Sequence, residues 1–153
     1  MHRAVLEHAD TADVVIMAAA VADYAPDQRA DQKMSKTGDT MTLVLKKTPD
    51  ILGELGTRRL KSGHGPLLVG FAAETEDLVP RAAEKLRTKH VDLIVANDVS
   101  RKDSGFDVDL NAVTIISGDG SESLALQSKS RVAAEVLDRV ERLLVKSPTN
   151  ARH

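Results

Sequence analysis

Residues 14–24 read VVIMAAAVADY and constrain the fold more than any other stretch of the chain. The β-branched residues Val14, Val15 and Ile16 favour an extended backbone. A short apolar run bounded by polar residues is typical of a buried parallel strand. The run passes into alanines before Asp23, and small residues let another molecule approach the backbone closely. In open α/β sheets, ligands bind beyond the carboxyl ends of strands. The stretch therefore fits a ligand-binding strand end, and it equally fits a core strand followed by a capping aspartate.

Two later apolar runs have the same character, at residues 67–72 (LLVGFA) and 91–96 (VDLIVA). Polar side chains follow each run, Glu74 after the first and Asn97–Asp98 after the second. The carboxyl ends of parallel strands meet at one edge of a sheet. We therefore expect these side chains and Asp23 to share one edge.

Helical patterns alternate with these strands, at residues 48–60, at 78–90 and from Ser128 onward, after a short one at 3–10. Such alternation predicts an α/β fold that is Rossmann-like, with a mostly parallel sheet and helices on both faces. A Gly-Asp-Gly turn inside residues 112–126 adds a C-terminal hairpin.

Residues 25–39 are polar and show neither a helical nor a strand period. Loops of this length are usually lids, binding loops or disordered segments, so we expect a flexible flap that carries Lys33 and Lys36. Solvated surface lysines are the ordinary alternative. We expect one domain over residues 1–146 that includes this flap, and a disordered tail over 147–153.

The segment after the flap predicts a strand and then a helix start. Residues 40–46 alternate apolar and polar side chains, which indicates a half-buried strand. Thr48 is a good N-cap, Pro49 suits the first helical position, and Asp50 complements the positive end of a helix. Structural capping explains all three, but the unpartnered amides of a helix start also suit an anionic or polar ligand.

Composition excludes several classes of function. The chain has 153 residues, a net charge of −2 and three aromatic residues, so neither a basic field nor stacking platforms indicate nucleic-acid binding. The lack of cysteine excludes disulfides, thiolate zinc sites and a cysteine nucleophile. The run at 14–22 follows acidic residues, unlike a signal peptide. No apolar run approaches the ~20 residues that span a bilayer. We expect a cytoplasmic protein with no membrane contact.

The chemistry on offer suits a nucleoside triphosphate. Lys85 and Lys89 lie one helical turn apart, where they could grip a phosphate chain or simply extend over the edge of the core. Nucleotidyl transfer needs positioning and charge neutralisation, with Mg²⁺ bridging phosphate oxygens. Neither GxGxxG after a strand nor GxxxxGK[ST] is present, and the histidines lack metal-ligand spacing.

Six ordered motifs give the chain a recognisable pattern. They are AAVADY with a lysine ten residues past its aspartate, TPDIL, GFAAET, the Lys85/Lys89 pair followed by Asp92, ANDV, and GF-x-x-D-x-N. Together they resemble the bacterial phosphopantothenate–cysteine ligase (phosphopantothenoylcysteine synthetase) family, the C-terminal domain of a bifunctional coenzyme A biosynthesis flavoprotein. The resemblance runs from about Asp13 to the last helix.

The resemblance implies a two-step ligation in coenzyme A biosynthesis. The carboxylate of 4′-phosphopantothenate attacks the α-phosphate of CTP, which releases pyrophosphate and gives an acyl cytidylate. The amine of cysteine then attacks the acyl carbon and releases CMP. The family forms homodimers in which the arm around residues 25–46 reaches the partner. FMN belongs only to the decarboxylase domain to which the ligase is normally fused, and this chain lacks that domain.

The family's functional residues transfer onto this chain by position. Lys33 is the expected catalytic residue, because a lysine on a closing loop can neutralise charge in the first step. The metal ligands are not assigned, and Asp23 suits ribose, base or Mg²⁺ equally. The expected nucleotide contacts are Met17, Ala18, Ala19, Asp23, Lys33, Pro49, Asp50, Ile51, Leu52, Phe71, Lys85 and Lys89.

Two departures from the family pattern stand out. Ser35 occupies the position of a second flap lysine. By the resemblance, the first strands of the family domain and a glycine- and serine-rich loop, whose asparagine is important for turnover, would precede Met1. Activity of this chain alone therefore stays open, as does the preference for CTP over ATP. A non-catalytic CTP-binding or dimerisation fragment and a Rossmann-like NAD(P)-binding oxidoreductase are the alternatives.

Overall fold

The computed structural model describes residues 1–28, 32, 38–74, 76–98 and 109–146. The chain divides into two compact units, which are treated separately. The larger unit comprises Met1–Ala19 and Ile51–His153, and the smaller one comprises Ala20–Asp50. The single domain expected over 1–146 stays a prediction, and the expected tail over 147–153 lies outside the described residues.

The larger unit alternates helices and strands along the chain, as an α/β fold requires. Its helices are α1 (His2–Ala9), α2 (Ile51–Ser62), α3 (Leu78–Thr88) and α4 (Lys129–Lys146). Its strands are β1 (Val14–Met17), β4 (Leu67–Glu74), β5 (Leu93–Asp98), β6 (Leu110–Asn111), β7 (Val113–Ser117), β8 (Gly120–Ser123) and β9 (Gln127–Ser128).

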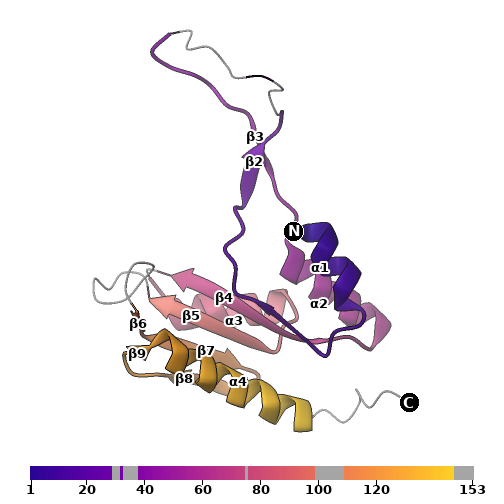
Figure 1. Ribbon diagram of the computed structural model, residues 1–153, viewed down its shortest axis with the longest axis vertical. Helices are drawn as coiled ribbons and strands as arrows, with labels where there is room; N and C mark the ends of the chain where they lie inside the picture. Colours follow the sequence, from indigo (N-terminus) through magenta and orange to yellow (C-terminus); the bar gives the residue numbers. More distant parts are fainter. Residues whose placement is uncertain (29–31, 33–37, 75, 99–108, 147–153) are drawn as a thin grey trace. The chain divides into compact units, whose positions relative to one another are not determined.

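Five of these strands form one mixed sheet in the order β1-β4-β5-β7-β8 (Figure 1). Strands β1, β4 and β5 are parallel, whereas β7 pairs antiparallel with β5 and with β8. The expectation of an α/β fold with a C-terminal hairpin is confirmed. The expectation of a mostly parallel sheet is wrong, because the hairpin joins the sheet through β7 and makes half of the strand pairings antiparallel. Strands β6 and β9 form a separate two-stranded pair.

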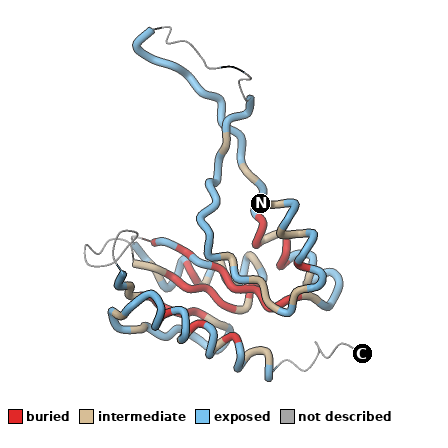
Figure 2. The backbone as a smooth tube through the Cα atoms, viewed as in Figure 1, coloured by how far each residue is buried: buried red, intermediate tan, exposed pale blue. Residues whose placement is uncertain are grey.

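Helices cover both faces of the mixed sheet, as the alternating pattern predicts. Leu68, Ile94 and Ile116 belong to the core cluster that contains residues of α1, α2 and α3. The odd-numbered residues of the same strands point to the opposite face. They belong to a second cluster with Val132, Val136 and Val140 of α4. Figure 2 shows the buried positions concentrated along β4 and β5. Two apolar layers explain why residues 67–72 and 93–96 are apolar on both faces of the sheet.

The parallel strands are tied together at their amino ends by a polar cluster. Arg59 of α2 donates to the carbonyls of Pro66 (3.0 Å) and His90 (2.7 Å) and forms an ion pair with Asp92. Asp92 also accepts the Leu68 N–H at 2.7 Å. Because these groups come from a helix, a turn and two strand starts, the cluster fixes how β4 and β5 begin.

The smaller unit is a two-stranded antiparallel ribbon of β2 (Tyr24–Pro26) and β3 (Leu45–Lys47). The Thr48 N–H donates to the Asp23 carbonyl at 2.8 Å, and the Thr48 hydroxyl donates to the Ala22 carbonyl at 2.5 Å. The predicted N-cap at Thr48 is therefore wrong: its side chain bonds across the ribbon, and α2 begins at Ile51.

The predicted half-buried strand over 40–46 is also wrong. Only Leu45–Lys47 is extended as a strand, and Met41, Leu43 and Leu45 are 65%, 54% and 52% exposed. A two-stranded ribbon has no second layer against which an apolar face can pack. Its alternating pattern therefore does not lead to burial within the described chain. Among the described helices, none combines the length and apolar character needed to cross a membrane.

Candidate nucleotide site

The carboxyl ends of β4 and β5 meet at one rim of the mixed sheet. Glu74 stands opposite Asp98 in the register, and Ala73 stands opposite Asn97. The expectation that Glu74 and Asn97–Asp98 share an edge is confirmed. Asp23, the third expected side chain, belongs to the smaller unit.

Glu74 is the most buried charged side chain at this rim. It is 7% exposed, and its carboxylate accepts from Lys85 Nζ at 2.5 Å while Arg81 lies 3.7 Å away. Burial of a carboxylate is costly unless it is paired, so two basic residues of α3 hold it. Lys85 remains 43% exposed. It therefore stabilises Glu74 and still presents a cation to solvent beside the rim.

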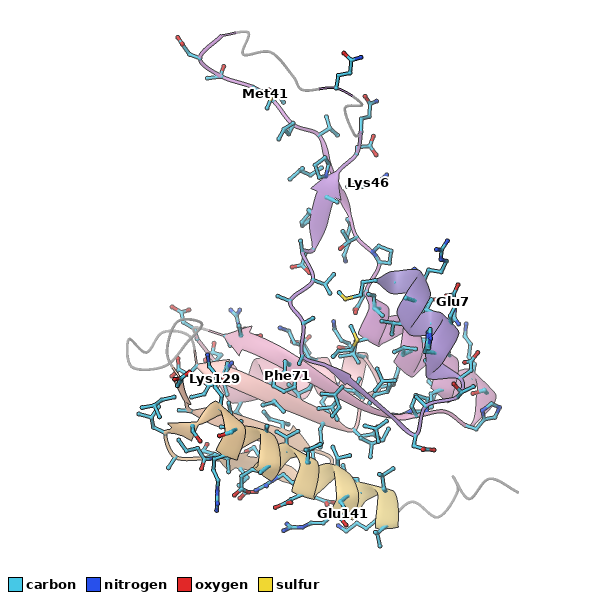
Figure 3. The ribbon with its side chains drawn as sticks, in the orientation of Figure 1. Glu7, Met41, Lys46, Phe71, Lys129 and Glu141 are labelled. Atoms are coloured by element: carbon cyan, nitrogen blue, oxygen red, sulfur yellow. The ribbon has the colours of Figure 1, made fainter. Side chains whose placement is uncertain are left out.

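The other face of the rim offers an aromatic ring and an unpartnered polar atom. Phe71 lies on the same face of β4 as Val69, toward the α4 cluster, and is 40% exposed. Figure 3 labels it on the sheet. Asn97 lies on the corresponding face of β5, and its Oδ1 is buried with no hydrogen-bond partner among the described residues. Such orphaned buried acceptors are rare in folded proteins.

The strand end at β1 has the predicted accessible backbone. Met17 is the last residue of β1 and packs partly into the core, while Ala18 and Ala19 are exposed. Ile51 and Leu52 open α2 with buried side chains, 4% and 9% exposed. These two residues can therefore meet a ligand only through their backbone amides, which lack intrahelical partners at a helix start.

Within the predicted lysine pair, Lys85 contacts a residue of the rim. Lys85 reaches Glu74, but Lys89 caps the C-terminus of α3 about 6 Å further along the helix axis. There its backbone lies against Gly56 of α2, so closely that a Cβ on Gly56 would be 1.8 Å from the Lys89 oxygen. Phe71 and Lys85 also lie on opposite faces of β4. A ligand that contacts all three would have to extend over the rim and along α3.

The remaining predicted contacts lie elsewhere in the chain. Asp23, Pro49 and Asp50 belong to the smaller unit and are exposed. Lys33, the predicted catalytic residue, and Ser35 lie outside the described residues. Among the described residues, no three His, Asp or Glu side chains gather into a metal-binding group.

Sequence reasoning missed two polar clusters. It passed over Arg59, whose partners lie up to 33 residues away in sequence. It also passed over Glu54, which accepts from His2 and Arg58 at 2.7 Å each. Hydrogen bonds from His2 and then Arg58 hold the pKa of Glu54 below its usual value. The i, i+4 spacing of Glu54 and Arg58 is the one signal that could have been read beforehand.

Comparison with known proteins identifies relatives over nearly the whole chain. A Bacillus subtilis (strain 168) protein named "Coenzyme A biosynthesis bifunctional protein CoaBC" is 46% identical over 144 residues, which are 94% of this chain and 34% of that protein. The chain thus spans about a third of the length of this relative.

Two solved structures agree in fold. The crystal structure of the C-terminal domain of a coenzyme A biosynthesis bifunctional protein CoaBC has a TM-score of 0.72 at 36% identity. The match covers 95% of this chain and 62% of that one. The DNA/pantothenate metabolism flavoprotein from Streptococcus pneumoniae has a TM-score of 0.71 at 25% identity, with 92% and 68% covered.

The family comparison covers the same region. The family described as "DNA/pantothenate metabolism flavoprotein C-terminal domain" matches residues 1–144, which include both units and every residue of the rim. The chain therefore belongs to the DNA/pantothenate metabolism flavoprotein C-terminal domain family.

Proposed function

We propose that this chain is a phosphopantothenate–cysteine ligase domain that acts with CTP in coenzyme A biosynthesis. The observation that carries the proposal is the family match over residues 1–144, together with a 46% identical relative named for coenzyme A biosynthesis. The described rim supports it, because parallel strand ends, an accessible backbone and a cation are the parts that a nucleotide site needs.

The proposed reaction has two steps. The 4′-phosphopantothenate carboxylate displaces pyrophosphate from CTP to form an acyl cytidylate, and the amine of cysteine then displaces CMP. Neither step needs a protein nucleophile. The protein has to hold the reactants in line and neutralise phosphate charge.

Several of the predicted residues that the structure describes have roles that their environments permit. The exposed backbone after Met17 suits recognition of the base at close range. Phe71 is sufficiently exposed to contact the base, and the first amides of α2 suit a polar group of the nucleotide. Lys85 would meet the triphosphate by exchanging part of its bond to Glu74. Lys33 neutralises charge in the first step.

Mg²⁺ fits the chemistry of the rim. Nucleotide enzymes commonly hold Mg²⁺ through one or two carboxylates together with substrate phosphates. Glu74 and Asp98 are register partners on the neighbouring strands β4 and β5. When bound, Mg²⁺ would neutralise phosphate charge. We further propose a cytoplasmic homodimer, and that FMN serves only a decarboxylase domain to which such a ligase domain is normally fused.

A thermal-shift screen tests the proposal against its alternatives. CTP with Mg²⁺ should raise the melting temperature by mass action, and ATP should have a smaller effect. A rise in melting temperature with NAD(P)H alone would favour an oxidoreductase. An unchanged melting temperature with every nucleotide would contradict a nucleotide site.

Product assays separate binding from catalysis. Pyrophosphate release should require both CTP and 4′-phosphopantothenate, and CMP release should also require cysteine. Lys33→Gln should slow pyrophosphate release without lowering the melting temperature, while the matched surface variant Lys61→Gln should change neither. CTP binding without any product would favour the non-catalytic alternative. Equal losses of stability and activity in Lys33→Gln would show that Lys33 is structural.

A further inference from the structure

A cavity lies away from the rim, between α4 and the β7–β8 hairpin. Its volume is about 270 Å³. Leu93, the first residue of β5, lines it, whereas the rim begins at Asn97. Asn97 lies four residues further along the strand, or about 13 Å away. The cavity is therefore independent of the proposed nucleotide site, and the inference does not rest on the proposed function.

Three basic residues of α4 line one wall of this cavity. Arg139, Arg142 and Lys146 are spaced at i, i+3 and i+7, which places them on one face of the helix. Figure 3 labels Lys129 near the start of α4 and Glu141 in its second half, the half that borders the cavity. Leu93, Ile115 and Leu143 provide an apolar floor.

The hairpin supplies the opposite wall, which is polar. Ser117, Asp119, Gly120, Ser121 and Glu122 line it. The lining thus combines two hydroxyls and two carboxylates with the three cations of α4. Its formal charge is +3 − 2 = +1.

Arg139 is already committed to protein partners. It is 14% exposed and bonds Glu122 at 2.7 Å and Glu135 at 2.8 Å. The Glu122 hydrogen bond raises the pKa of Arg139 above its usual value. Arg139 and Glu122 therefore neutralise each other and form a fixed side of the cavity.

The other two cations are available. Arg142 forms no hydrogen bond or ion pair with any described residue. Lys146 pairs with Asp119 at 3.3 Å, but the two side chains are 68% and 80% exposed. Exposed pairs of this kind contribute little. Lys146 can therefore turn to a ligand while Asp119 turns to solvent.

We propose that this cavity binds a small organic phosphate monoester. A dianion matches the two exposed cations Arg142 and Lys146, which lie one helical turn apart, and a guanidinium suits phosphate oxygens in two-point contact. Ser117 and Ser121 would donate further hydrogen bonds. The apolar floor would take the organic part, and the volume restricts the ligand to a small one.

Titration of the chain followed by ¹H–¹⁵N NMR tests this inference, with glycerol 3-phosphate and inorganic phosphate as probes. Glycerol 3-phosphate should shift the NMR signals of the Ser117 amide, of the amides of 119–121 and of the Arg142 Nε–H. These shifts should saturate as the probe concentration rises. Arg142→Gln should weaken binding about tenfold or more, as loss of a charge-assisted hydrogen bond predicts. Arg131→Gln removes the same charge from α4 outside the cavity and should weaken binding less than twofold, about the ionic-strength effect of one surface charge.

Other results would overturn the inference. Equal weakening by both variants would indicate non-specific attraction to α4. If inorganic phosphate binds as tightly as glycerol 3-phosphate, the apolar floor does not contribute to binding. If millimolar glycerol 3-phosphate causes no chemical-shift change, the cavity is not a phosphate site. Lys146→Gln provides a second variant if Arg142→Gln loses helicity by circular dichroism, and it should also weaken binding.

Discussion

Replacing Gly56 with alanine tests how α2 and the end of α3 fit together. A Cβ at this position would lie 1.8 Å from the Lys89 carbonyl oxygen and 3.1 Å from the His90 oxygen. Both contacts are backbone atoms, so rotation of a side chain cannot relieve the clash. Lys89–His90 must move away from α2, which also disturbs the Arg59 bond to the His90 carbonyl.

The magnitude follows from two opposing terms. Alanine in place of a helical glycine gains about 1 kcal/mol in helix propensity. Overpacking typically costs about 1–3 kcal/mol, and a 1.8 Å contact with backbone belongs at the upper end of that range. We expect a net loss of about 2 kcal/mol in the free energy of unfolding. That corresponds to a melting temperature lower by about 4–8 °C for a chain of this size.

Urea denaturation and differential scanning calorimetry measure this loss. Gly118→Ala is the matched control, since a Cβ there meets nothing within 4 Å, and it should change stability by less than about 0.5 kcal/mol. Because Gly56 contacts the Lys89 backbone, Gly56→Ala should also weaken CTP binding if Lys89 is a nucleotide contact. A stable Gly56→Ala protein would refute the packing of α2 against the end of α3.

Three further perturbations address the polar clusters. Arg59→Ala should lower the free energy of unfolding by about 2–3 kcal/mol in urea titrations, because two carbonyls and Asp92 lose a donor; an effect near zero would contradict the cluster. Lys85→Met should cost about 1–2 kcal/mol, less than a fully buried pair because Lys85 is 43% exposed, and the loss should shrink in a Glu74→Gln background. The pKa of Glu54 is lowered in the fold, so its contribution is present above the unfolded pKa and lost as pH falls through the folded pKa. Glu54→Gln should therefore flatten the acid side of a melting-temperature profile, and an unchanged slope would contradict the His2–Glu54 interaction.

The core strands could be predicted because a continuous run of apolar residues indicates a strand that is buried on both faces. Residues 67–72 and 93–96 are apolar on both faces, and the structure packs helices on both sides of them. The same logic misled at 40–46, where alternation is present but the ribbon has no opposing layer. It also missed that β7 joins the main sheet, because pairing direction is set by tertiary contacts.

The site was only partly predictable for a similar reason. Strand-end positions locate Glu74 and Asn97–Asp98 at one rim, because register follows from parallel pairing. The Lys85–Glu74 pair depends on how α3 packs, and the Arg59 cluster joins groups 33 residues apart. Residue spacing alone does not encode either contact.

The most direct test of the proposed nucleotide site is a crystal structure of the chain with CTP and Mg²⁺. We predict the base against the backbone of 17–19 and near Phe71, with the triphosphate on the Lys85 side of the rim. Nucleotide bound at the amino ends of the strands, or a rim left unchanged at saturating CTP, would contradict the proposed site.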